Sequence, residues 1–122
     1  MQAEIRGQVA HHAGEAAERQ IALHYERLGF KILYRRWRGA GGEIDLIVRN
    51  PEILVFVEVK KSRSIARAAE RISRRQIARI LASAEEFLAR EPDSQLIDVR
   101  IDAALVDELG TFEILENAFG HD

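Results

Sequence analysis

The stretch GEIDLIVRNPEILVFVEVK, residues 42–60, decides the fold of this chain. Two apolar runs flank the turn signal Asn50-Pro51-Glu52, so the sequence predicts one strand over residues 43–49 and another over residues 53–60. Residues 30–37 alternate like a strand as well and precede a glycine-rich turn. The three segments together predict a β-meander.

Side chains alternate along a strand, so residues 53–60 present two faces. One face carries Leu54, Phe56, Glu58 and Lys60, and the other carries Val55, Val57 and Val59. Glu58 and Lys60 therefore point the same way, and Asp45 on the neighbouring strand can join them. A charge inside an apolar strand usually has a partner or a metal ion, because an unpaired buried charge is unfavourable. An exposed, salt-bridged strand end is the alternative, but the apolar flanks favour central strands.

These residue types suit a metal-dependent nuclease. Carboxylates such as Asp45 and Glu58 offer the oxygen ligands that Mg²⁺ or Mn²⁺ prefers, and the carbonyl of Val59 is a plausible further ligand. The cation lowers the pKa of a bound water and offsets charge on the phosphate. Lys60 can orient that water or stabilise developing negative charge. We therefore predict Asp45, Glu58 and Lys60 as the catalytic set, with Glu43, next to the glycine turn, as a secondary residue.

Two polar residues interrupt predicted helical stripes. Glu18 lies among apolar neighbours of the first helix, so its carboxylate is expected to find a partner across the fold. That partner is either the metal pocket or a structural bond to Tyr25 or backbone. Gln76 lies on the apolar line of a later helix and is expected to touch the site or to bond a strand edge.

The remaining pattern predicts an α/β fold. A helix is expected over residues 3–28, a loop over residues 62–66, and then one long helix that runs to about Arg90 and stops before Pro92. Two more strands are expected over residues 96–106 and 111–115. The order α-β-β-β-α-β-β indicates a central sheet flanked by helices, in one domain over residues 1–122.

Basic residues concentrate in the first two thirds of the chain. Residues 1–80 hold 16 Lys/Arg and 9 Asp/Glu, whereas residues 81–122 hold 2 and 11, although the net charge is only −2. This asymmetry fits either a basic working face or a solvated mixed surface. The residues expected to contact nucleic acid are Arg36, Arg38, Lys61, Arg63 and an i+4 ridge of Arg67, Arg71, Arg75 and Arg79. Trp37 either stacks on a base or packs in the core.

Composition excludes several classes of protein. The chain has no cysteine, which excludes disulfides, zinc–thiolate sites and thiol catalysis. It has neither an apolar run long enough for a membrane span nor a signal-peptide pattern, so a cytoplasmic protein is expected. The 4 histidines form no cluster that would support histidine catalysis.

The motifs resemble those of the YraN-like family of small bacterial proteins of predicted nuclease type. The resemblance covers nearly the whole chain and is carried by Glu18, Ala22, Tyr25, Gly29-Phe30, Trp37-Arg38, the GEIDL and VFVEVK segments, and Asn117-Ala118-Phe119. Departures from the usual family pattern occur at Ala17, Arg36 and Lys61, none of which is an expected ligand. These departures leave the expected metal site intact but put any carry-over of substrate geometry in doubt.

This resemblance implies a branch of the restriction-endonuclease-like superfamily, similar to archaeal Holliday-junction resolvases. It implies a three-layer α-β-β-β-α-β core in which Asp45, Glu58 and Lys60 are catalytic and Glu18 assists the metal. The expected function is Mg²⁺- or Mn²⁺-dependent hydrolysis of nucleic acid, with DNA and branched structures foremost. A resolvase-like reaction requires a homodimer, for which residues 97–106 offer an apolar edge strand. The rival hypotheses are a non-catalytic nucleic-acid-binding module and a protein-interaction domain on the same fold.

Overall fold

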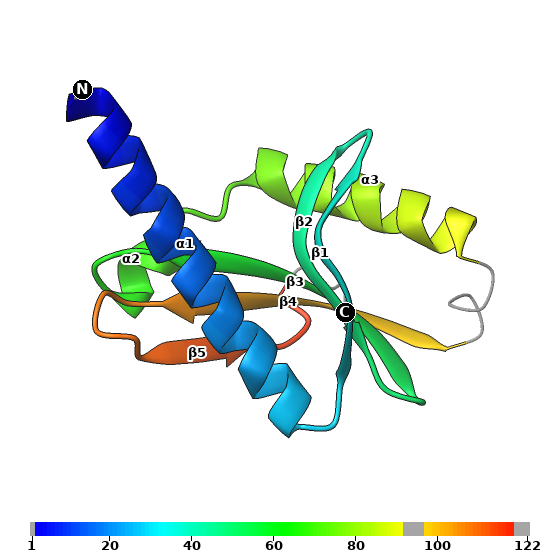
Figure 1. Ribbon diagram of the computed structural model, residues 1–122. Helices are drawn as coiled ribbons and strands as arrows, with labels where there is room; N and C mark the ends of the chain where they lie inside the picture. The colour runs from blue at the N-terminus through cyan, green and yellow to red at the C-terminus, as the bar shows by residue number, and fades with distance from the viewer. Residues whose placement is uncertain (1, 92–96, 119–122) are drawn as a thin grey trace.

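The computed structural model describes residues 2–91 and 97–118, with side chains from Gly14 onward (Figure 1). A single mixed sheet has the strand order β1-β2-β3-β4-β5, in which β3 and β4 are parallel and the other neighbours are antiparallel. Along the chain, the elements are α1 (Gln2–Arg27), β1 (Lys31–Gly39), β2 (Gly42–Arg49), β3 (Ile53–Lys61), α2 (Ile65–Glu70), α3 (Arg74–Arg90), β4 (Asp98–Val106) and β5 (Phe112–Leu115).

Helices cover both faces of the sheet. Figure 1 shows α1 crossing one face, while α2 and α3 lie on the other. The α2–α3 connection carries the chain from β3 across the sheet to β4, which is why these two strands are parallel. The predicted α/β architecture, with its helix–strand–strand–strand–helix–strand order, is confirmed.

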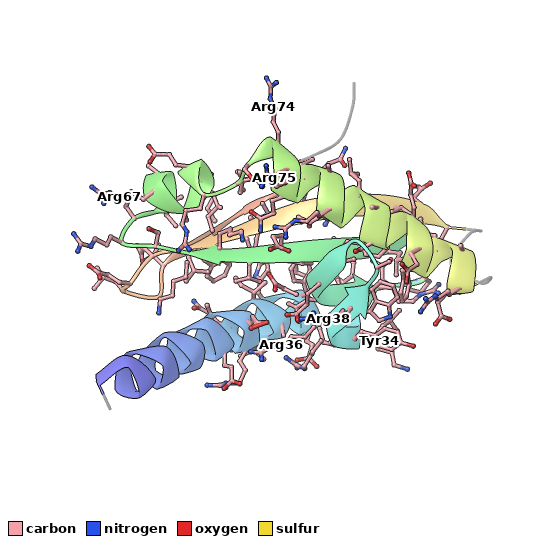
Figure 2. All side chains as sticks on the ribbon, turned by 90° about the horizontal axis from the view of Figure 1, so that it is seen from above. Tyr34, Arg36, Arg38, Arg67, Arg74 and Arg75 are labelled. Carbon is pink, nitrogen blue, oxygen red and sulfur yellow. The ribbon has the colours of Figure 1, made fainter. Side chains whose placement is uncertain are left out.

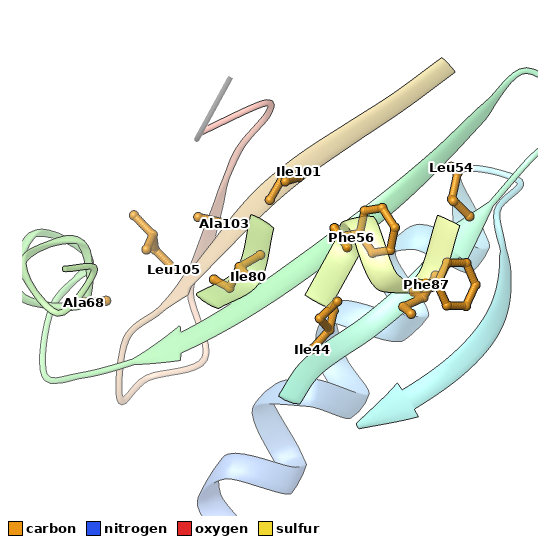
Figure 3. Close-up of a cluster of buried hydrophobic side chains, with 11 residues drawn as sticks. Ile44, Leu54, Phe56, Ala68, Ile80, Phe87, Ile101, Ala103 and Leu105 are labelled. Atoms are coloured by element: carbon orange, nitrogen blue, oxygen red, sulfur yellow. The ribbon is translucent and has the colours of Figure 1, made fainter. Parts of the chain in front are cut away.

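The alternation predicted for β3 divides the core into two parts. Leu54 and Phe56 pack with Phe87 on the α3 side, in the cluster drawn in Figure 3. Val55 and Val57 pack on the opposite face against Ile21 and other residues of α1. Because both faces are covered, the middle of β3 is fully buried, and a charged residue at its end enters a low-dielectric environment.

The prediction of one helix from residue 67 to Arg90 is wrong, because α2 and α3 are separate helices. The loop predicted to extend to residue 66 also ends early, since α2 already begins at Ile65. The Ser64 hydroxyl accepts a hydrogen bond from the Arg67 N–H at 3.1 Å, and Ser73 Oγ does the same for the Gln76 N–H at 3.1 Å. Each serine is thus the N-cap that begins its helix, which divides the expected arginine ridge between two segments.

The prediction that residues 97–106 form an edge strand is also wrong. β4 pairs with β3 on one side and with β5 on the other, so it is an interior strand. β1 and β5 are the edges of the described sheet. The predicted beginning of β4 at Leu96, the helix-breaking Pro92 and the motif residue Phe119 lie outside the described residues.

A buried carboxylate in β4 anchors the end of α1. Asp102 is 0% exposed and accepts hydrogen bonds from the Tyr25 hydroxyl at 2.7 Å and from the backbone N–H of Asn117 at 3.0 Å. Arg100 donates to both of its oxygens, at 2.7 and 2.9 Å. This network fixes the end of α1 against the sheet. The earlier turns of α1 are thereby held near the ends of β2 and β3, where they can present a polar side chain.

Candidate active site

Asp45 and Val59 meet where the backbone pairing of β2 with β3 ends. The ladder between these strands runs from Arg49↔Leu54 to Leu46↔Val57. Beyond it, Asp45 Oδ2 accepts a hydrogen bond from the backbone N–H of Val59 at 2.7 Å. The carboxylate therefore takes the place of a main-chain acceptor, which satisfies a partly buried donor and fixes the side chain beside Glu58.

Glu58 is held by two donors on one oxygen. Lys60 Nζ lies 3.3 Å from Glu58 Oε1, and Gln76 Nε2 of α3 donates to the same atom at 3.0 Å. Glu58 as a whole is only 6% exposed, and its buried Oε2 accepts no hydrogen bond from an N–H or hydroxyl group in the part of the chain that the structure describes. One face of this carboxylate is thus fixed while the other is left available to a ligand. Of the two placements expected for Gln76, contact with the site is confirmed.

Burial disfavours the ionised forms of both acids, and the charge of Glu58 adds to this effect at Asp45. Burial, and then the nearby Glu58 charge, raise the pKa of Asp45 to about 8, against the opposing effects of the Val59 N–H and Lys60. Burial also raises the pKa of Glu58, while Lys60 and the hydrogen bonds from Asp45 and Gln76 oppose that shift. Two close carboxylates with one ammonium form a site that an additional cation would stabilise.

Glu18 of α1 has an arginine as its partner across the fold. Arg36 of β1 forms a fork with it, with Nη2 3.0 Å from Oε2 and Nε 3.4 Å from Oε1. The alternative bond to Tyr25 is wrong, because the Tyr25 hydroxyl donates to Asp102 instead. Glu18 still belongs to the neighbourhood of the site, since its charge is one of the causes that raise the pKa of Asp45. Among the side chains that the structure describes, in residues 14–91 and 97–118, no three His, Cys, Asp or Glu residues form a ready-made metal cluster.

Three adjoining pockets surround these acids. The middle one measures about 420 Å³, and its polar lining is Glu18, Asp45, Lys60, Lys61 and Arg71. Asp45 also lines a smaller pocket of about 180 Å³, together with Glu58, Gln76 and Arg79. Glu18 also lines a pocket of about 360 Å³ on the side of β1, with Glu15, Arg19, Arg35 and Arg36. Asp45 thus lies between the middle pocket and the small one, and Glu18 lies between the middle pocket and the one beside β1.

The arginines expected to bind nucleic acid do not form one ridge. Arg71 and Arg79 line the pockets beside the acids, and Arg71 Nη1 also donates to the Lys61 carbonyl at 2.9 Å. Arg67 and Arg74 extend outward from the two helices, as Figure 2 shows. The exposed basic residues around the site are Arg36, Arg38, Arg63, Arg67, Arg71, Arg75 and Arg79, with Lys61 half-buried.

Two residues near the glycine turn are engaged within the protein. Arg38 Nη2 lies 3.3 Å from Glu43 Oε2, which places Glu43 at the rim of the small pocket, as the sequence indicated. Trp37 packs edge-on against Phe87, with ring centroids 5.4 Å apart, and belongs to the core on the α3 side. Of the two roles considered for Trp37, the structure therefore shows core packing.

Sequence reasoning missed several residues that shape the site. It did not pair Arg36 with Glu18, and it gave Arg19 no role. It also missed Ser83, whose hydroxyl donates to the Gly42 carbonyl at 2.8 Å and holds the glycine turn against α3. The turn also approaches α3 closely at Gly41, where an added Cβ would lie 3.0 Å from Ala82 Cβ. The glycine-rich composition of the turn is a sequence signal that could have predicted this approach.

None of the helices that the structure describes combines the length and the apolar character that a membrane crossing requires.

Comparison with known proteins identifies the family. Residues 17–106 match the model of a family described as "Uncharacterised protein family UPF0102". A UPF0102 protein of Ruegeria pomeroyi is 58% identical over 116 residues, covering 95% of this chain and 94% of the relative. A UPF0102 protein of Cereibacter sphaeroides strain KD131 is 56% identical, with coverages of 94% and 98%, and one of Roseobacter denitrificans is 53% identical, with coverages of 92% and 87%. The matched segment contains Glu18, Asp45, Glu58 and Lys60, and the chain belongs to the UPF0102 family.

Proposed function

We propose that this protein is a divalent-cation-dependent phosphodiester hydrolase that acts as an endonuclease on nucleic acid, with DNA as the expected substrate. The observation that carries the proposal is the buried Oε2 of Glu58, which accepts no hydrogen bond from an N–H or hydroxyl group of the described residues and belongs to a carboxylate beside Asp45. An orphaned carboxylate oxygen in such a place indicates a missing electropositive ligand, because a buried polar atom is otherwise satisfied within the protein. The raised pKa of Asp45 has the same implication.

The donor set fits Mg²⁺ or Mn²⁺. Asp45 and Glu58 would hold the cation through carboxylate oxygens, and the carbonyl of Val59 would add a third hard ligand. Glu18 would complete the ligand set only by leaving Arg36, which now engages both of its oxygens. When bound, the cation would supply an acidified water and positive charge at the phosphate.

The side chains of the site would position the reacting groups. Gln76 and Lys60 fix Glu58 through its Oε1 and leave Oε2 open. Lys60 reaches the middle pocket and can donate to a phosphate oxygen, where its charge stabilises the negative charge that develops in phosphoryl transfer. Asp45 cannot swing freely, because the Val59 N–H holds it.

Basic residues around the pockets support a polyanionic substrate. Lys61 and Arg71 line the middle pocket, and Arg79 lines the small one. Contacts of this kind bind the phosphate backbone and carry no base sequence, so the proposed recognition is by backbone and shape. The overall charge of −2 does not oppose this proposal, since the acidic residues concentrate after residue 80.

The fold is compatible with the restriction-endonuclease-like superfamily, to which the resemblance of the motifs points. A shared fold alone does not establish an activity, so the proposal depends on the site residues. Branched DNA and a homodimer are the finer expectations drawn from the resolvases. A dimer through a sheet edge would use β1 or β5, the edges of the described sheet, because β4 is covered on both sides.

Cleavage assays test this function. The purified protein is incubated with duplex, single-stranded and four-way-junction DNA in Mg²⁺, Mn²⁺ or EDTA. We expect cation-dependent cleavage that Glu58→Gln and Lys60→Ala abolish and that Arg90→Gln retains. Arg90 is the matched control because it is exposed, pairs with Glu86 at 2.9 Å and lies at the far end of α3.

A non-catalytic nucleic-acid-binding module is the second candidate. The engagement of Glu18 by Arg36 favours it, because the described residues then offer two carboxylates rather than three to a cation. Salt-sensitive binding without cleavage in any cation would support this candidate and overturn the enzyme.

A further inference from the structure

We propose that Arg36 is a switchable phosphate ligand: Glu18 holds its guanidinium while the site lacks a cation, and releases it to a backbone phosphate when Glu18 turns to the cation. This inference rests on the proposed function and assigns a second, phosphate-binding pocket next to the site. The pocket lies between α1 and β1 and is lined by Glu15, Glu18, Arg19, Arg35, Arg36 and Leu46.

Glu18 is the boundary between this pocket and the candidate active site. It lines the pocket of about 360 Å³ on the Arg36 side and also the pocket of about 420 Å³ on the Asp45 side. Its side chain is 16% exposed and lies close enough to Asp45 for its charge to act on that group. A change of side-chain rotamer, without movement of α1, is therefore sufficient to turn the carboxylate from one pocket to the other.

Arg36 is held toward α1 by its backbone as well as by its ion pair. Its φ angle is +54°, a left-handed conformation that is unusual for a residue other than glycine, and it lies in strand β1. The neighbouring pairs Arg35↔Leu46 and Trp37↔Ile44 place Arg36 opposite Asp45 across the two strands. Such a conformation persists only where the surroundings maintain it, and here it directs the guanidinium between β1 and α1 (Figure 2).

The net charge of the pocket becomes more positive when Glu18 leaves. With Glu18 in place, the pocket holds three arginines and two glutamates, and Arg36 is 3.0 Å from Glu18 and 3.6 Å from Glu15. Without Glu18, three guanidinium groups remain with one carboxylate. An arginine fork that binds a carboxylate through two parallel donors can bind a phosphate in the same manner. The ligand class is therefore a phosphate of the strand bound in the adjoining middle pocket.

The consequence is that cation and nucleic acid bind cooperatively. A cation that attracts Glu18 frees Arg36, and a phosphate that engages Arg36 frees Glu18, so each ligand favours the other. We measure the dissociation constant of a fluorescent single-stranded oligonucleotide by anisotropy, in Ca²⁺ and in EDTA. Ca²⁺ takes oxygen ligands, and a gel confirms that the oligonucleotide stays intact.

The wild type and four variants test the switch. The wild type is expected to bind about fivefold more tightly in Ca²⁺ than in EDTA. Arg36→Gln is expected to match the wild type in EDTA and to lose most of the gain in Ca²⁺, whereas Arg36→Lys retains part of it. Glu18→Gln is expected to bind in EDTA about as tightly as the wild type binds in Ca²⁺, because only the longer contact with Glu15 then holds Arg36. Arg90→Gln, with the same change of charge outside the pockets, should keep the full Ca²⁺ response.

Two results would overturn the switch. One is an equal loss of affinity for Arg36→Gln in Ca²⁺ and in EDTA, which would make Arg36 an ordinary surface cation. The other is an unchanged affinity of Glu18→Gln in EDTA, with circular dichroism confirming that the variant is folded. Cleavage of DNA by the wild type in Mg²⁺ is scored separately. Cleavage together with either result would leave the proposed function standing and remove only the switch.

Discussion

The carboxylate of Asp45 accepts a hydrogen bond from the backbone N–H of Val59, with 2.7 Å between the two heavy atoms. This contact lies immediately beyond the last backbone pair of β2 and β3, Leu46↔Val57. An acid is thereby fixed at a point where the two strands separate and where pockets open on both sides of it. The hydrogen bond between Asp45 and Val59 thus lies at the end of the backbone pairing and also orients the acid of the candidate site.

Asp45 should make the cation-free protein less stable as the pH rises. Its pKa is raised by burial, and then by the charge of Glu58, from the usual 3.8 to about 8. Below about pH 4 the carboxyl is protonated whether the chain is folded or unfolded. Between about pH 4 and pH 8 the folded state retains a proton that the unfolded state has lost, so the free energy of unfolding falls as pH increases through this window.

The Asp45→Asn variant isolates this effect, because its amide oxygen can still accept from Val59. Urea unfolding in EDTA should show that the variant gains stability relative to the wild type between pH 5 and pH 9, by more than about 1 kcal/mol. Asp98→Asn, at an exposed aspartate of β4, is the control and should show little change. A difference between Asp45→Asn and the wild type that stays constant with pH would contradict the assignment.

Gln76 should act by orienting Glu58 rather than by touching the substrate. Its amide donates to Glu58 Oε1 at 3.0 Å, the oxygen that Lys60 also contacts. Gln76→Ala removes one hydrogen bond from a buried carboxylate, which corresponds to about 1.5–3 kcal/mol for a charged acceptor. We expect weaker Mn²⁺ binding by calorimetry at neutral pH and partial recovery at higher pH, where Glu58 ionises despite the missing donor. Ser73→Ala, which removes only the helix cap, is the control.

The residues that could be predicted from sequence are those whose environment follows from strand periodicity. Side chains alternate along β3, so Phe56 and Val57 face opposite sides of the sheet, and both sides are covered. The same alternation brings Glu58 and Lys60 to one face. The helix break at residues 71–73 could not be predicted, since the apolar spacing continues across it and only the cap at Ser73 interrupts the helix. The pair Arg36–Glu18 depends on a left-handed backbone angle and on packing between β1 and α1, neither of which leaves a local pattern.

Asp102 should be important for stability and not for chemistry. It is fully buried, and four donor atoms, from Tyr25, Arg100 and the Asn117 backbone, satisfy it. Asp102→Ala leaves the Arg100 guanidinium and the Tyr25 hydroxyl without their acceptor, and we expect a loss of about 3–5 kcal/mol in the free energy of unfolding. Tyr25→Phe removes only one of these bonds and should lower stability by about 1 kcal/mol.

Chemical denaturation of both variants checks this prediction. If Asp102→Ala were less destabilising than Tyr25→Phe, the network would have little structural importance. Nucleic-acid affinity, measured at a temperature where both variants remain folded, should equal that of the wild type, because Asp102 belongs to the network that anchors the end of α1 and lines none of the three pockets around the acids.

Substitution of an arginine that lines a pocket should slow cleavage more than substitution of an arginine that points outward, although each substitution removes one positive charge. Arg79 lines the small pocket with Asp45 and Glu58, whereas Arg74, five residues earlier in α3, extends into solvent (Figure 2). Both should reduce the slope of log Kd against log salt by about 1, if each contacts a phosphate. Only Arg79→Gln should also lower kcat for cleavage in Mg²⁺, by roughly tenfold, because only its charge is next to the reacting phosphate. Equal effects of Arg74→Gln and Arg79→Gln on kcat would show that the small pocket is remote from the chemistry and would move the reacting phosphate to the Lys61–Arg71 side.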